Sequence, residues 1–188
     1  MKQPIAGVAP SELEEVTTMI VWPSIAATWA GRKLGELYSI KWPNIYIFRI
    51  GNLFALISIP IALALYFYRL KPCVLGIPLY GVFYRLTNRR VMVLRNEINF
   101  QRKFPFLRFQ YGAEAKSVEL DRFDEIDLVR HPGQAWFDAG DLVFKLNGVE
   151  TFRLDGVSRP EAFRTTLMNS RRSYVGVKTA LTREAVPA

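Results

Sequence analysis

The chain of 188 residues contains one cysteine, Cys73, and one histidine, His131. One cysteine cannot form an internal disulfide, and no Cys/His spacing typical of a structural zinc site is present. The sequence also lacks Gly-x-Ser-x-Gly, His-Glu-x-x-His, phosphate-binding glycine-rich and dinucleotide-binding motifs. We therefore predict no catalytic residue, no metal site and no cofactor, and we expect a protein that is not an enzyme.

Two polar features are interpreted as structural. The segment 121–127, "DRFDEID", gathers four carboxylates without the spacing of a calcium loop, so we expect solvated strand edges. His131 precedes Pro-Gly and has no neighbouring partner for acid–base chemistry. Trp136 is interpreted as a rim aromatic of the β domain, with an anchor for a partner protein as the alternative.

Charge is absent from one long stretch, "IGNLFALISIPIALALYFY", which runs for 19 residues between Arg49 and Arg69. A helix of this length covers about 28 Å, close to the hydrocarbon thickness of about 30 Å. We predict one transmembrane helix within 44–71, although Pro60 would kink it. A buried core helix is the alternative, but a chain this small could hardly cover such a helix on every side.

The regions beside this stretch predict further membrane contact. Residues 1–43 are expected to be extended and then to form an interfacial helix, and a second crossing by 16–31 stays open. Residues 72–80 form a linker. Positive charge is denser after the span, which places the following domain on the cytoplasmic side of a bacterial inner membrane. The tryptophans expected to contact lipid are Trp22, Trp29 and Trp42.

Residues 81–177 change to short β-rich runs separated by turn signals. "VFYRL" and "RVMVL" flank Thr87-Asn88-Arg89-Arg90 and predict a hairpin, and Asn147-Gly148 predicts a second one. Ser158 and Glu161 match a capping box at the start of a C-terminal helix whose inward face carries Phe163 and Leu167. Residues 178–188 are expected to be a tail. The fold class is an α+β membrane protein with a small antiparallel barrel or sandwich, capped by this helix.

The motifs "YRLTNRRVMVL", "ELDRFDEIDLV", "GDLVFKLNG" and "TFRLDGVSRPEAFRTTL" occur in this order within about residues 80–175. This order resembles the membrane-anchored bacterial pleckstrin-homology-like (PH-like) domains. The resemblance implies a strongly bent, seven-stranded antiparallel barrel plugged by a helix. It implies no common enzymatic activity, and one branch of the family assists the assembly of photosynthetic complexes.

Residues 96–116 depart from this resemblance, because they form a long insert in which aromatic and basic residues alternate. Such a segment can dock on a protein partner, enter a lipid interface or stack on nucleic acid, and a nearby membrane span disfavours nucleic acid. The alternative is a purely structural role, in which the segment forms a long hairpin whose aromatic side chains fill the barrel and whose basic side chains are solvated. The residues expected to bind a partner are Phe100, Arg102, Lys103, Phe104, Phe106, Arg108, Phe109 and Tyr111.

The function that this pattern favours is a non-catalytic scaffold, assembly or accessory subunit. Its expected partners are other subunits of a larger bacterial membrane complex, with a photosynthetic reaction-centre complex as one candidate, together with membrane lipids and without nucleic acid. The alternative is a membrane-surface module that binds lipid head groups through Arg85, Arg89 and Arg90, since each cation adds about 1 kcal/mol near an anionic leaflet. Another interpretation of the turn with Arg89 and Arg90 is a hairpin tip whose arginines are solvated and bind no ligand.

Overall fold

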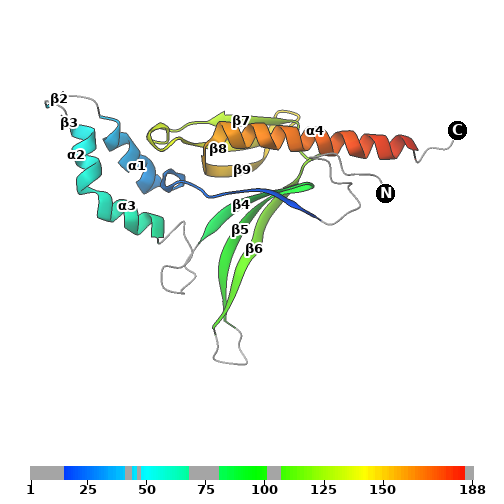
Figure 1. Ribbon diagram of the computed structural model, residues 1–188, viewed down its shortest axis with the longest axis horizontal. Coiled ribbons are helices and arrows are strands. Elements are labelled where there is room, and N and C mark those ends of the chain that lie inside the picture. Colours follow the sequence, from blue (N-terminus) through cyan, green and yellow to red (C-terminus); the bar gives the residue numbers. More distant parts are fainter. Residues whose placement is uncertain (1–14, 41–43, 46–47, 68–80, 101–106, 185–188) are drawn as a thin grey trace.

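The computed structural model describes residues 15–40, 44–45, 48–67, 81–100 and 107–184, in an α+β arrangement with two main antiparallel sheets and a C-terminal helix (Figure 1). In chain order the elements are β1 (Thr17–Val21), η1 (Ile25–Ala27), α1 (Trp29–Tyr38), β2 (Asn44–Ile45), β3 (Phe48–Arg49), α2 (Ile50–Ile57), α3 (Ile59–Leu65), β4 (Val82–Thr87), β5 (Arg90–Phe100), β6 (Leu107–Glu119), β7 (Glu125–Val129), η3 (Ala135–Phe137), β8 (Ala139–Leu146), β9 (Val149–Ser158) and α4 (Pro160–Glu184).

The first sheet has the strand order β1-β4-β5-β6. The predicted hairpin between β4 and β5 is confirmed, because Leu86 pairs with Val91 on the two sides of the turn. The Thr87 hydroxyl accepts hydrogen bonds from the main-chain N–H groups of Arg89 and Arg90, which fixes the turn locally.

The second sheet has the order β7-β8-β9, and its β8–β9 hairpin turns at Asn147 and Gly148. Both residues have positive φ, 53° and 79°, as a two-residue turn of this kind requires. Lys145 pairs with Glu150 across the ladder, so the predicted hairpin and its register are confirmed.

The core lies where both sheets meet α4. Leu86 comes from the first sheet, Phe144 and Leu154 from the second, and Phe163 and Leu167 from the helix, and all five side chains are fully buried. Burial of each such side chain contributes about 1.5–3 kcal/mol. The predicted inward face of the C-terminal helix is therefore confirmed.

The expected closed PH-like barrel is wrong for the part of the chain that the structure describes. The described strands of the two sheets stay in separate ladders, linked by an isolated bridge between Pro23 and Val157. β1 comes from the N-terminal segment and pairs with β4. This pairing occupies an edge of the first sheet that would otherwise be free to close on the second.

The expected transmembrane helix is also wrong. The uncharged stretch forms two short helices, α2 and α3, which meet at Ser58 and point in different directions (Figure 1). Pro60 lies in the first turn of α3, where its missing N–H is tolerated, and this position starts a new helix instead of kinking a long one. Within the described ranges, no helix combines the length and apolar character that a bilayer crossing requires. This finding overturns the single-pass topology and the localisation that we derived from it.

The start of α4 differs from the predicted capping box. The Ser158 hydroxyl donates to the main-chain oxygen of Trp22 (3.0 Å), and Glu161 accepts from Arg130 (2.9 Å). Arg159 between them has a φ of 49°, so the chain enters the helix through a left-handed residue. At its other end α4 continues past residue 177, where we expected the domain to end, through Glu184.

The helices α1, α2 and α3 form an arm at one end of the molecule (Figure 1). A buried polar network joins η1, which precedes this arm in the chain, to the second sheet. The Asp141 carboxylate accepts from the Gln134 side-chain amide (2.6 Å) and from the Gly156 N–H (2.8 Å) through the same oxygen. Its other oxygen lies 3.2 Å from Nε2 of His131. The Gln134 amide also reaches the main-chain oxygen of Ala26 in η1 (3.4 Å).

Candidate functional site

The outer side of α2 and α3 is apolar and exposed. Leu56 is 65% exposed and Ile57 is 68% exposed, and no charged residue occurs between Arg49 and Arg69. We call the exposed large apolar residues of this segment the apolar face. They are Leu53, Phe54, Leu56, Ile57, Ile59, Ile61, Leu63, Tyr66 and Phe67. Isolated exposed apolar side chains are normal, whereas a continuous set of them marks an interaction surface.

The inner side of the same helices carries small residues. Gly51 is buried against α1, where an added Cβ would lie 2.2 Å from the main-chain oxygen of Tyr38. The Tyr38 hydroxyl hydrogen-bonds to the Ser58 hydroxyl. Ala55 and Ala62 are partly buried at the same helical spacing. A helix that packs on its own domain normally directs its large apolar residues inward. Here Gly51, Ala55, Ser58 and Ala62 point inward, and most of the large apolar residues, though not Leu65, are exposed.

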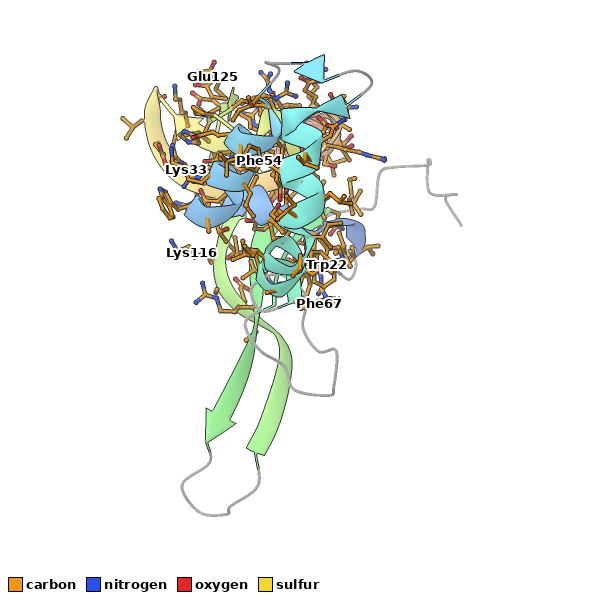
Figure 2. The ribbon with its side chains drawn as sticks, turned by 90° about the vertical axis from the view of Figure 1, so that its left-hand side faces the viewer. Trp22, Lys33, Phe54, Phe67, Lys116 and Glu125 are labelled. Atoms are coloured by element: carbon orange, nitrogen blue, oxygen red, sulfur yellow. The ribbon has the colours of Figure 1, made fainter. Side chains whose placement is uncertain are left out.

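An apolar groove of about 500 Å³ lies between α3 and the segment that joins β1 to η1. Its walls include Trp22 and Ile25 on one side, Ile59 and Tyr66 on the other, and Phe137 from η3. In Figure 2, Trp22 and Phe67 are labelled at the same end of the arm. The groove thus extends the apolar face towards the body of the protein.

Of the predicted lipid-contacting tryptophans, Trp22 lines the groove beside this face. Trp29 begins α1 and is 71% exposed, while Trp22 is half-exposed and packs on Phe83 with ring centroids 5.1 Å apart. Trp42 lies outside the described residues. Lys33 on α1 is exposed and pairs with Glu36 at 2.7 Å. Indole rings and long basic side chains are typical of a lipid–water interface.

The three arginines predicted to bind head groups lie apart from this face, on the β4–β5 hairpin. Arg90 is already engaged, because its guanidinium binds both carboxylate oxygens of Glu15 (2.9 and 3.0 Å) and also Glu114 (3.0 Å). The hydrogen bond from Arg90 holds the pKa of the Glu15 carboxyl below its ordinary value. Arg85 lies over the ring of Phe83 at 5.9 Å, and Arg89 is partly buried in the turn.

The aromatic–basic insert is only partly described. Arg102, Lys103, Phe104 and Phe106 lie outside the described residues. The backbone of β5 and β6 forms a long hairpin that projects away from the body (Figure 1), but the side chains of the other predicted members are not described. These are Phe100, Arg108, Phe109 and Tyr111. The predicted partner-binding role of the insert stays a prediction.

The acidic segment 121–127 has protein partners. Asp121 pairs with Lys178, Asp127 pairs with Lys145, and Asp124 accepts from the main-chain N–H of Asn147 (3.0 Å). Across the described part of the chain, no cluster of histidine, cysteine and acidic residues has the grouping that a metal ion needs. These carboxylates therefore hold β7 and α4 in place.

A second cavity, of about 240 Å³, lies between the first sheet, β9 and η1. Arg95, Lys116, Arg153 and Asp155 line it, together with Tyr84. Sequence reasoning missed this group because its members are far apart in the chain. The small inner face of α2 and α3, in contrast, has a readable signal in the spacing of Gly51, Ala55, Ser58 and Ala62.

Comparisons with models of known families, with curated proteins and with solved structures found no match to this chain. The expected relation to PH-like domains therefore stays a prediction.

Proposed function

We propose that the protein is a non-catalytic membrane-surface module, which binds lipid by inserting the apolar face of α2 and α3 into one leaflet. The observation that carries this proposal is the reversed arrangement of these helices, with small residues against the body and large apolar residues in solvent. A helix lying in the plane of an interface buries such a face among head groups and acyl chains without crossing the bilayer.

The surroundings of the apolar face support this proposal. The groove beside α3 can accept apolar chain segments, and its volume of about 500 Å³ is in the range of small-ligand sites. Trp22 offers an amphipathic ring at the edge, and the net charge of +8 favours an anionic leaflet. None of these features needs the transmembrane span that the structure overturns.

The expected scaffold or accessory subunit would use the same face against an apolar protein partner. The absence of charge from the entire outer side of α2 and α3 favours lipid, because the rim of a protein interface is normally polar. Docking on a photosynthetic or other membrane complex stays a prediction and is a separate outcome of the experiment below.

The experiment is flotation of the full-length chain with vesicles of phosphatidylcholine and phosphatidylglycerol. Leu56→Asp and Ile57→Asp each remove an inserting side chain that contributes about 1.5–3 kcal/mol, so each variant should bind vesicles roughly 10- to 100-fold more weakly. Val149→Asp is the matched control, because Val149 is 67% exposed at the tip of the β8–β9 hairpin, away from the arm.

The proposal predicts that the wild type and Val149→Asp float with the vesicles while the two arm variants stay in solution. Equal flotation of all four proteins would overturn it. Failure of the wild type to float, with a stable oligomer that Ile57→Asp dissociates, would also overturn it and would assign the face to protein contact.

A further inference from the structure

The 240 Å³ cavity is formed by three parts of the chain that are remote in sequence. β4, β5 and β6 supply one wall, β9 supplies another, and the segment around η1 closes the third. Tyr84 lines this cavity and is buried, and its hydroxyl donates to the main-chain oxygen of Asp155 (2.7 Å), which joins the first sheet to β9. The site is thus a product of the tertiary fold, and the geometry does not depend on the apolar face.

Two cations at this cavity have no protein partner among the residues that the structure describes. Arg95 on β5 and Lys116 on β6 are exposed, and within the described ranges neither makes a hydrogen bond or an ion pair. Several other exposed cations of the described residues are paired, as Arg130 is with Glu161 at 2.9 Å and Lys33 with Glu36 at 2.7 Å. Two neighbouring unpaired cations at one cavity create an electropositive site.

The backbone of β6 is irregular at this point. Val93 pairs with Lys116 and Leu94 pairs with Glu114, so Ala115 is an extra residue in β6. Such a bulge redirects the neighbouring side chains and is common beside functional sites. Both Lys116 and Ala115 line the cavity.

The remaining charges leave the cavity positive. Arg153 lines the cavity, and its guanidinium forms an ion pair with Glu150 at 3.1 Å. Burial raises the pKa of the Asp155 carboxyl, and the Asp141 carboxylate raises it further, while Arg153, Arg32 and Lys116 act in the opposite direction. Three cations and one carboxylate line the cavity, which leaves an excess of positive charge for a ligand.

We propose that this cavity binds a phosphate group, held by Arg95 and Lys116 and supported by Arg153. A phosphate dianion accepts several hydrogen bonds, and guanidinium and ammonium groups together provide charged donors for them. The volume of about 240 Å³ is below that of drug-sized ligand sites, so it suits a phosphate with a short substituent. The apolar wall of Val82, Val93 and Pro23 would contact that substituent.

Such a phosphate can belong to a free phosphorylated metabolite or to a lipid head group. Two arms of one experiment distinguish these sources. The first is calorimetric titration of the full-length chain with glycerol 3-phosphate and, separately, with inorganic phosphate. The second is flotation with phosphatidylcholine vesicles that contain or lack phosphatidic acid. Arg95→Gln and Lys116→Gln are the test variants, and Arg164→Gln, an exposed cation on α4, is the control.

We expect saturable binding in one arm, weakened about tenfold or more by each test variant, as is typical for loss of one charged partner of a bound anion. Arg164→Gln should bind like the wild type. Absence of saturable binding in both arms, or equal loss with Arg164→Gln, would overturn the proposal. Leu56→Asp separates this inference from the proposed function, because it should weaken binding to neutral vesicles roughly 10- to 100-fold and leave the titration with glycerol 3-phosphate unchanged.

Discussion

Asp141→Ala should destabilise the protein strongly, because one buried carboxylate organises the polar network that joins the second sheet to η1. Its Oδ1 accepts from the Gln134 amide at 2.6 Å and from the Gly156 N–H at 2.8 Å, and Gln134 is fully buried. An unpaired buried donor costs about 1–3 kcal/mol. The Gln134 amide keeps a long contact with the Ala26 oxygen at 3.4 Å, so the total should be about 2–5 kcal/mol.

Urea unfolding followed by far-ultraviolet circular dichroism measures this effect, since the loss would be a large part of a typical stability of about 5–15 kcal/mol. Asp124→Ala is the matched control, because Asp124 also accepts from a main-chain N–H, that of Asn147, but in an exposed position. The control should lose less than about 1 kcal/mol. An Asp141→Ala variant as stable as the control would refute the role of the network.

Two further predictions concern the backbone and the ion pairs. Gly133→Ala should lower the free energy of unfolding by at least about 2 kcal/mol more than Gly148→Ala, as measured by thermal unfolding. Both glycines have left-handed φ, but only at Gly133 would an added Cβ meet another group, because it would lie 2.0 Å from the main-chain oxygen of Arg32. Equal losses would contradict the close packing. Arg90→Ala should lose about 0.5–2 kcal/mol at pH 7, because its two ion pairs are partly exposed. The lowered pKa of Glu15 stabilises the fold above its ordinary value of 4.5, and this contribution is lost as the pH falls through the folded-state pKa. The difference between wild type and Arg90→Ala should therefore shrink in urea titrations below about pH 4.5, and a difference that grows there would contradict the pairing.

The elements that the sequence predicted well are those with local signals. Asn147-Gly148 specifies its turn through residues that tolerate positive φ, so the hairpin and its register follow from adjacent residues. Phe163 and Leu167 share one helical face by spacing alone, and both are buried.

The errors arose where distant segments decide the structure. β1 pairs with β4, although the two strands are separated by more than sixty residues in the sequence, and no local sequence pattern predicts this pairing. Hydropathy predicts a span from the uncharged stretch because it ignores the change of direction at Ser58 and Pro60. Ser158 is a residue type that fits a capping box, but in the folded chain its hydroxyl donates a hydrogen bond to the main-chain oxygen of Trp22 instead.

The candidate sites divide in the same way. The inner and outer faces of α2 and α3 can be read from residue size at helical spacing, with Gly51 and Ser58 inside and Leu56 and Ile57 outside. The cavity with Arg95 and Lys116 required the tertiary structure, because β9 and η1 complete it.

The most direct test of lipid insertion is the environment of the apolar face itself. With Cys73, the single cysteine, replaced by serine, an environment-sensitive fluorophore is attached at Ile57→Cys or at Val149→Cys. Addition of phosphatidylcholine–phosphatidylglycerol vesicles should shift the emission of the label at position 57 to shorter wavelength and increase it, while the label at position 149 stays unchanged. An unchanged label at position 57, or the same response at both positions, would contradict insertion of α2 and α3 into the leaflet.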